Sequence, residues 1–152
     1  MHASVQWLNQ YLTPANLTAD EAADVLMNLG FPIETRDELA PADGGPDTRL
    51  DVEVTSNRGD CLCQVGLARE VAAQTGRRFT PPQPKPATAT GGPAASALTL
   101  ENRHPDLCPL FTARVIRGVK VGPSPAWLVR ALAAVGIVWD LRLPPEGLLR
   151  RR

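Results

Sequence analysis

The stretch LDVEVTSNRGDCLCQVGLAREVAAQTG, residues 50–76, decides the fold of this chain. Its first residues alternate between apolar and acidic, which is the period-two pattern of a half-buried strand. The next five, TSNRG at 55–59, favour a tight turn. We then expect a helix with Asp60 as its N-cap, because a carboxylate can accept hydrogen bonds from first-turn amides. Gly76 stands where a left-handed residue commonly ends a helix. The apolar stripe of this helix recurs at helical spacing: Leu62, Val65, Ala68, Val71 and Ala72.

Two helices are predicted upstream of this stretch. Residues 4–12 suit a short helix capped by Ser4, and the capping box that begins at Thr18 starts a second helix, which ends at Gly30. Residues 31–38 then predict a short polar strand, and the Gly- and Pro-rich residues 40–48 predict a surface loop. Three small helices and a two-stranded ribbon together predict a winged-helix-like domain, which we assign to residues 1–78.

Downstream, the pattern changes twice. Residues 79–97 are rich in Pro and Ala and predict an extended linker. From residue 98 to 152 the pattern predicts an incomplete α+β module of two strands and a helix. The strands are expected at 98–100 and 111–121. The helix is expected to start at Pro125 with Ser124 as its cap, to bury one side from Trp127 to Val135, and to end at Gly136. The predicted fold class is therefore α+β throughout.

Composition restricts the partners and the compartment. The chain has 16 basic and 16 acidic residues, and this balance weakens the case for a free-standing nucleic-acid binder. The three cysteines, Cys61, Cys63 and Cys108, are an odd number without a signal peptide, which favours a reducing cytoplasm. Their spacing favours small apolar fillers over metal ligands. No apolar run approaches the roughly 20 residues of a membrane span, so no membrane partner is expected.

The sequence contains one candidate functional site. No catalytic triad and no phosphate-binding loop with its lysine is found, so no catalytic, cofactor-binding or metal-binding residues are predicted. The turn at Asn57, Arg58 and Asp60 is the candidate turn or contact site. An arginine held in a turn can bind a carboxylate or a phosphate with its planar guanidinium. The alternative is that Arg58 and Asp60 stabilise the turn itself.

The residues TSNRGDCL at 55–62 and GLAREVA at 66–72 resemble a signature of the bacterial phenylalanyl-tRNA synthetase β subunit. The similarity extends over about residues 5–136 and includes CPLFTAR at 108–114 and RGVKVGPSPAWL at 117–128. The resemblance implies that the first part matches the opening domain of that subunit, and that the part after the linker matches the start of its editing domain.

The same resemblance implies a cytoplasmic α2β2 enzyme that joins phenylalanine to its tRNA with ATP and magnesium. Its catalytic site would lie on the α subunit, the expected partner. Three departures matter, of which the mildest is Ser56 at a position where the family normally has proline. Only residues 40–48 stand where the family carries an oligonucleotide-binding barrel, and the likeness stops after Gly136, where a divergent tail begins. No residues of the family's editing pocket or magnesium site can be carried over.

Three functional hypotheses follow from these observations. The first is a fragment or truncated relative of the β subunit, with a structural or assembly role in tRNA aminoacylation and protein synthesis, weak tRNA contact at most, and no active site of its own. The second is a non-enzymatic RNA- or DNA-binding module. The third is independent hydrolysis of mischarged tRNA, which the short module at 98–152 disfavours because such chemistry requires a closed pocket.

Overall fold

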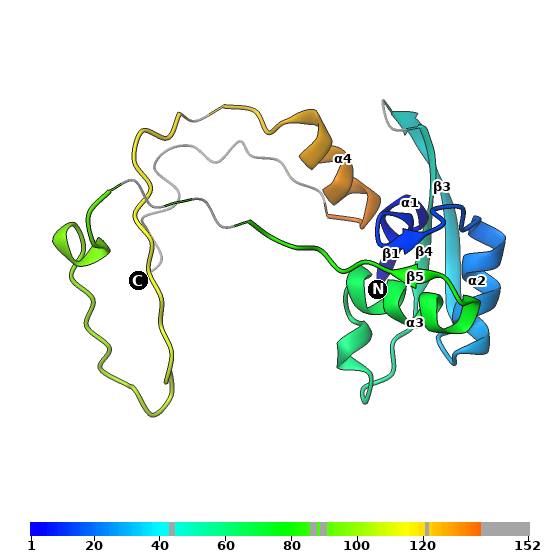
Figure 1. Cartoon of the computed structure of the whole chain (residues 1–152), viewed down its shortest axis with the longest axis horizontal. Coiled ribbons are helices and arrows are strands. Elements are labelled where there is room, and N and C mark those ends of the chain that lie inside the picture. Colours follow the sequence, from blue (N-terminus) through cyan, green and yellow to red (C-terminus); the bar gives the residue numbers. More distant parts are fainter. Residues whose placement is uncertain (43–44, 86–87, 89–90, 121, 138–152) are drawn as a thin grey trace. The chain divides into compact units, whose positions relative to one another are not determined.

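The computed structural model describes residues 1–42, 45–85, 88, 91–120 and 122–137, and Figure 1 shows the whole chain. These residues form helices and small antiparallel sheets, so the predicted α+β class is confirmed. The chain divides into two units. One combines Met1–Gln83 with the residues from Pro123 onward, and the other is Pro84–Gly122.

A three-stranded antiparallel sheet forms the centre of the first unit. The strand β4, Gly45–Val52, lies between β1, His2–Ser4, and β3, Ile33–Ala42. Leu50 and Val52 are buried, while Asp51 between them is half-buried, so the predicted alternation is confirmed. The ribbon predicted from the sequence is the β3–β4 hairpin, to which β1 adds a third strand.

Three helices pack around this sheet: α1, Val5–Asn9; α2, Ala19–Asn28; and α3, Gln64–Thr75. The helix α1 contacts β4 and α3, and α2 contacts α3 and β3 (Figure 1). Ser4 caps α1 and Thr18 caps α2, each accepting a hydrogen bond from a first-turn amide, as predicted. The largest fully buried apolar side chains come from the three helices, from β4 and from the segment just after α2: Phe31, Leu8, Leu26, Leu50, Leu67, Val52 and Val71.

A small second sheet and an ion pair connect the chain around α1 and α2 to the segment that follows α3. The strand β2, Leu12–Thr13, pairs antiparallel with β5, Arg78–Phe79. Beside it, the Arg77 guanidinium donates to both carboxylate oxygens of Glu21, each at 2.7 Å. This bidentate contact with Arg77 is the main cause that lowers the pKa of Glu21. The first turn of α2 is thereby connected to the chain that follows α3.

The start of α3 differs from the prediction. Asp60 does not cap the helix, because a 3₁₀ turn, η1, Gly59–Cys61, intervenes and α3 begins only at Gln64. The cap is Cys63, whose Sγ accepts from the Gly66 amide at 3.4 Å. Leu62 is 61% exposed and lies outside the buried stripe, whereas Leu67 is fully buried. Gly76 ends the helix at φ 71°, as predicted.

The loop expected at residues 40–48 is also corrected. The strand β3 extends to Ala42 and β4 begins at Gly45, with these two residues paired across the hairpin. Backbone pairing therefore continues into a segment whose Gly and Pro content suggested a loop. The strands β1, β2 and β5 were not predicted, because elements of two or three residues are too short to show a period-two alternation.

The unit Pro84–Gly122 contains the 3₁₀ turn η2, Ala94–Ser96, and a turn in which the Cys108 amide donates to the His104 carbonyl at 2.9 Å. The strands expected at 98–100 and 111–121 are absent from the described residues of those ranges. Alternating apolar residues need a partner strand and a buried face, and here Phe111 is 58% and Ile116 is 73% exposed.

The helix α4, Ala126–Ala134, is present as predicted, and Gly136 follows it at φ 74°. Ser124 is not its cap, since the buried Ser124 Oγ has no hydrogen-bond partner among the described residues and Pro125 occupies the capping position. The apolar side expected to be buried is half-buried at most, and Trp127 is exposed.

From residue 138 on, the predicted divergent tail lies outside the described residues. No helix of the described part is both long and apolar enough to cross a membrane.

Candidate functional site

The candidate site forms where the chain leaves β4 and enters α3. The Arg58 amide donates to the Thr55 carbonyl at 2.9 Å, and the Cys61 amide donates to the Arg58 carbonyl at 2.8 Å. These two backbone bonds close consecutive turns and direct the Arg58 side chain toward α3. The Thr55 hydroxyl donates to Asn57 Oδ1 at 2.7 Å, so the Asn57 side chain is used within the turn.

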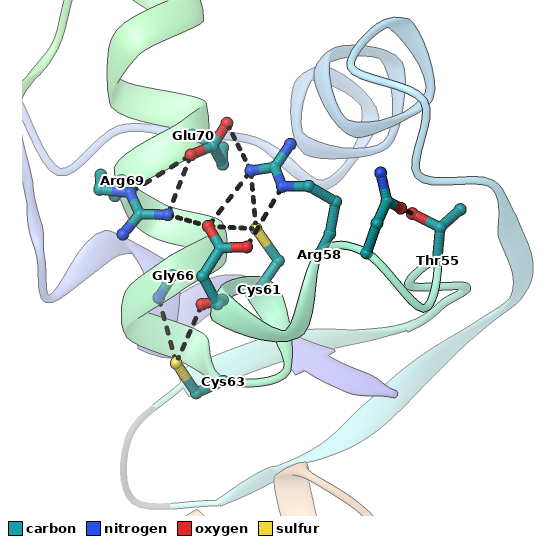
Figure 2. Close-up of polar contacts among 9 residues, drawn as sticks. Thr55, Arg58, Cys61, Cys63, Gly66, Arg69 and Glu70 are labelled. Carbon is teal, nitrogen blue, oxygen red and sulfur yellow. Dashed lines mark hydrogen bonds and ion pairs between the residues drawn. The ribbon is translucent and has the colours of Figure 1, made fainter.

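Arg58 is the centre of the side-chain contacts (Figure 2). Its Nε donates to Asp60 Oδ1 at 3.2 Å, and its Nη2 lies 3.0 Å from Glu70 Oε2. The same Nη2 donates to Cys61 Sγ at 3.1 Å. One guanidinium therefore connects the turn, the 3₁₀ segment η1 and the helix α3.

A second arginine completes the cluster. Arg69 on α3 donates through Nη2 to Asp60 Oδ2, and also to Glu70 Oε1 at 3.1 Å. Two guanidinium groups and two carboxylates thus neutralise one another. We call Arg58, Asp60, Cys61, Arg69 and Glu70 the Arg58 cluster.

The electrostatics of the cluster follow from these contacts. The hydrogen bond from Arg58, supported by that from Arg69, lowers the pKa of Asp60 to about 2. The contacts with Asp60 and Glu70 raise the pKa of Arg58. Burial raises the pKa of the Cys61 thiol, so this group is neutral near pH 7 and is a poor nucleophile.

Apolar packing and a close backbone approach support the cluster. The Arg58 guanidinium carbon lies 5.2 Å from the centroid of the buried Phe31 ring, within the range of a cation–π contact. On the other side, α3 packs directly against η1 at Gly66. A Cβ at this position would lie 2.0 Å from the Asp60 carbonyl oxygen. Only glycine allows the two segments to approach this closely.

The cluster does not fit a metal site. One ligand atom each from Asp60, Cys61 and Glu70 lie within 4.8 Å of one another. However, the positively charged Arg58 contacts all three residues, so the atoms that a metal would need as free ligands are already occupied. A cation would have to displace two guanidinium groups. The arrangement is instead suited to cross-linking three backbone segments.

A separate depression of about 250 Å³ lies beside α1 and β4. Its most polar lining group is Asp47, whose carboxylate accepts hydrogen bonds from the Ser4 hydroxyl, from the Gln6 amide at 2.9 Å and from the Thr48 amide at 2.8 Å. These bonds fix the start of α1 on the sheet. This carboxylate therefore serves the local structure and offers little to a ligand.

Of the three residues predicted as a turn or contact site, the structure brings Arg58 and Asp60 together and leaves Asn57 bonded within the turn. Four members of the surroundings were not predicted: Cys61 belongs to η1, Arg69 and Glu70 come from α3, and Phe31 comes from the chain just after α2. One signal was available: Gly66 interrupts a helix, and a glycine at such a position often marks a close packing contact.

The ion pair between Arg58 and Asp60 gives a pH-dependent prediction. The pKa of Asp60 falls from its ordinary value of about 3.8 to about 2 in the folded state, so the stabilising contribution of this ion pair is complete above about pH 5. It is lost as the pH falls through about 2. We therefore expect the stability difference between the wild type and Arg58→Gln to shrink as the pH falls from about 5 to 2. Urea midpoints at several pH values measure it.

The control for this experiment is Arg103→Gln, which removes another ion-paired arginine. Arg103 binds Glu101 at 2.9 Å, but the side chains are 76% and 66% exposed. Exposed pairs contribute little, so the urea midpoint of this variant should match the wild type at every pH. A difference for Arg58→Gln that stays constant down to pH 2 would show that Asp60 is not held by this contact.

Comparison with known proteins relates the chain to subunits of tRNA ligases. It is 44% identical over 137 residues, 90% of its length, to the phenylalanine–tRNA ligase β subunit of Rhodopirellula baltica. It is also 46% identical over 99 residues to that of Geobacter sulfurreducens, and 48% identical over 91 residues to that of Anaeromyxobacter dehalogenans. These matches cover 65% and 60% of this chain.

The chain is therefore a relative of the phenylalanine–tRNA ligase β subunit over most of its length, and the resemblance predicted from residues 55–72 is confirmed. It spans 19%, 12% and 11% of the length of these three relatives, respectively. No family model and no solved structure matches the chain.

Proposed function

We propose that this chain has a structural and assembly role of the phenylalanine–tRNA ligase β-subunit type, in the cytoplasm and in support of tRNA aminoacylation. The observation that carries this proposal is the similarity over 137 residues to a β subunit. A protein named as a β subunit works with another subunit, so the proposed partner is the α subunit of the same enzyme.

The geometry supports a scaffold rather than a reaction centre. The charged side chains of the 55–72 stretch bind one another in the Arg58 cluster, and Asp47 is occupied by backbone and hydroxyl donors. Catalytic groups need a free functional atom that faces a substrate. We therefore propose that the chain binds neither ATP nor magnesium and holds no active site of its own. We also propose that contact with tRNA is weak, since the whole chain has 16 basic and 16 acidic residues and therefore no basic excess.

Co-purification with the α subunit tests this proposal. The tagged full chain is co-expressed with a phenylalanine–tRNA ligase α subunit from a bacterial source, and the eluate is analysed by size-exclusion chromatography with light scattering. We expect a stable complex containing both chains. The variant Gly66→Ala, in which the Arg58 cluster cannot close, serves as the control and should lose the complex.

Two results would contradict the proposal. One is that the folded wild-type chain elutes without the α subunit. The other is that the chain alone charges tRNA with phenylalanine, or releases the amino acid from mischarged tRNA, faster than a buffer control.

A further inference from the structure

The formal charge of zero is the sum of two halves of the chain that carry opposite net charges. Residues 1–83 contain six Arg or Lys and twelve Asp or Glu, whereas residues 84–152 contain ten and four. The two halves therefore carry formal charges of −6 and +6. Between residues 107 and 137 the chain has four basic residues and no acidic one. Such segregation of charge within one chain favours an oppositely charged binding surface.

The positive charge is concentrated and unpaired in one segment. We define Phe111–Lys120 as the cationic strip; its ten residues are all exposed, and none lies in a helix or strand. Arg114, Arg117 and Lys120 recur every third residue, and none of them has a polar partner among the described residues. By contrast, five of the six arginines in residues 1–83 are ion-paired: Arg36, Arg49, Arg58, Arg69 and Arg77.

The first unit carries exposed carboxylates whose charge is opposite to that of the cationic strip. Asp24 on α2, Glu34 on β3 and Glu53 after β4 are exposed and unpaired within the described residues. Glu53 lies at the Pro32 end of the hairpin, since its amide donates to the Pro32 carbonyl at 2.8 Å. Met27, one helical turn after Asp24, is 49% exposed. We call Asp24, Met27, Glu34 and Glu53 the acidic face.

Both surfaces combine charge with exposed apolar groups. In the cationic strip, Ile116 and Val119 are 73% and 69% exposed, and Met27 provides the corresponding group on the acidic face. Opposite charges orient the two surfaces and speed their encounter. Apolar contacts add buried surface area, which stabilises the complex more than exposed ion pairs do. Every copy of the chain carries both surfaces in equal amount, so no further component is needed for them to meet.

We propose that the cationic strip of one copy binds the acidic face of a second copy. The contact joins different surfaces and is therefore heterologous, so it leaves one free strip and one free face on each pair and permits further addition. Because it depends on exposed charges, it weakens when salt shortens the screening length from about 30 Å at 0.01 M to about 8 Å at physiological ionic strength.

Sedimentation velocity on the full chain tests the proposal first. We expect the mean mass to rise with protein concentration at low salt, and the apparent association constant to fall at least about tenfold between 0.02 and 0.2 M NaCl. The variant Arg114→Glu/Arg117→Glu should stay monomeric. The variant Arg78→Glu/Lys85→Glu has the same change in net charge, at two exposed residues outside the strip, and should associate like the wild type.

Mixing two variants gives the sharper test. Arg114→Glu/Arg117→Glu keeps an intact acidic face, and Asp24→Lys/Glu34→Lys keeps an intact cationic strip. Each alone should be monomeric, with a circular dichroism spectrum like that of the wild type. Their mixture restores the wild-type contact between the intact strip of one variant and the intact face of the other, so it should form a complex that contains both variants.

Three results would overturn the proposal. The wild type could be monomeric at low salt, or the mixture could fail to associate although both variants are folded. The third is a strip that binds a labelled RNA oligonucleotide, with loss of binding in Arg114→Glu/Arg117→Glu, while the chain shows no self-association. None of these readouts involves the α subunit, so they are independent of the proposed function.

Discussion

Replacing Gly66 by alanine should destabilise the fold by about 2–4 kcal/mol, although alanine is the better helix former by about 1 kcal/mol. The added Cβ would lie 2.0 Å from the Asp60 carbonyl oxygen, 2.9 Å from the Asp60 carbonyl carbon and 3.1 Å from Cys61 Cα. All three are backbone atoms, so no side chain can rotate away. Either α3 or η1 must move, and the Arg58 cluster that spans them must open.

Chemical denaturation monitored by circular dichroism measures this effect, and Gly59→Ala is the matched control. Gly59 begins η1, does not have a positive φ, and a Cβ there would meet nothing within 4 Å. We expect Gly59→Ala to change the free energy of unfolding by less than about 0.5 kcal/mol. If the two variants were equally stable, the close approach of α3 to η1 would not be a requirement of the fold.

The correct predictions depend on local signals. The caps at Ser4 and Thr18 and the left-handed Gly76 are set by residues within one turn of the chain, so the sequence pattern is sufficient to identify them. The same reasoning failed at Asp60, because its carboxylate has stronger partners than helix amides. Those partners are Arg58, two residues away, and Arg69, nine residues away.

The sequence pattern identified only those residues of the candidate site that lie close to one another along the chain. Arg58 and Asp60 share one turn, so their contact could be expected. Glu70 and Phe31 approach Arg58 only after α3 has folded back and the sheet has placed the end of α2 beside the turn. The strands expected at 98–100 and 111–121 are a case in which a local pattern did not lead to the expected element. Their alternating pattern is present, but strand formation also requires a partner, which no local pattern can provide.

Replacing Phe31 by alanine should lower the free energy of unfolding by about 3–5 kcal/mol. This loss is larger than the one expected for Gly66→Ala. The ring is 1% exposed, lies in the core with Leu8, Leu26 and Leu67, and has the Arg58 guanidinium on one face. Its removal would leave a cavity and would also take away the surface on which Arg58 is positioned. A unit of this size has a total stability of only about 5–15 kcal/mol, so the variant should be partly unfolded at 37 °C.

Two further variants separate these contributions to stability. Phe31→Leu keeps most of the buried volume but removes the aromatic face, so it should cost less than about 1.5 kcal/mol. If the ring positions Arg58, the effects of Phe31→Leu and Arg58→Gln should be less than additive in a double-mutant cycle, because each removes the same contact. Leu107→Ala, at a side chain that is 79% exposed, should leave the unfolding midpoint unchanged. Strict additivity in the cycle would show that the Arg58 cluster is held by its carboxylates alone, and the stabilising role of Phe31 would then be limited to the core.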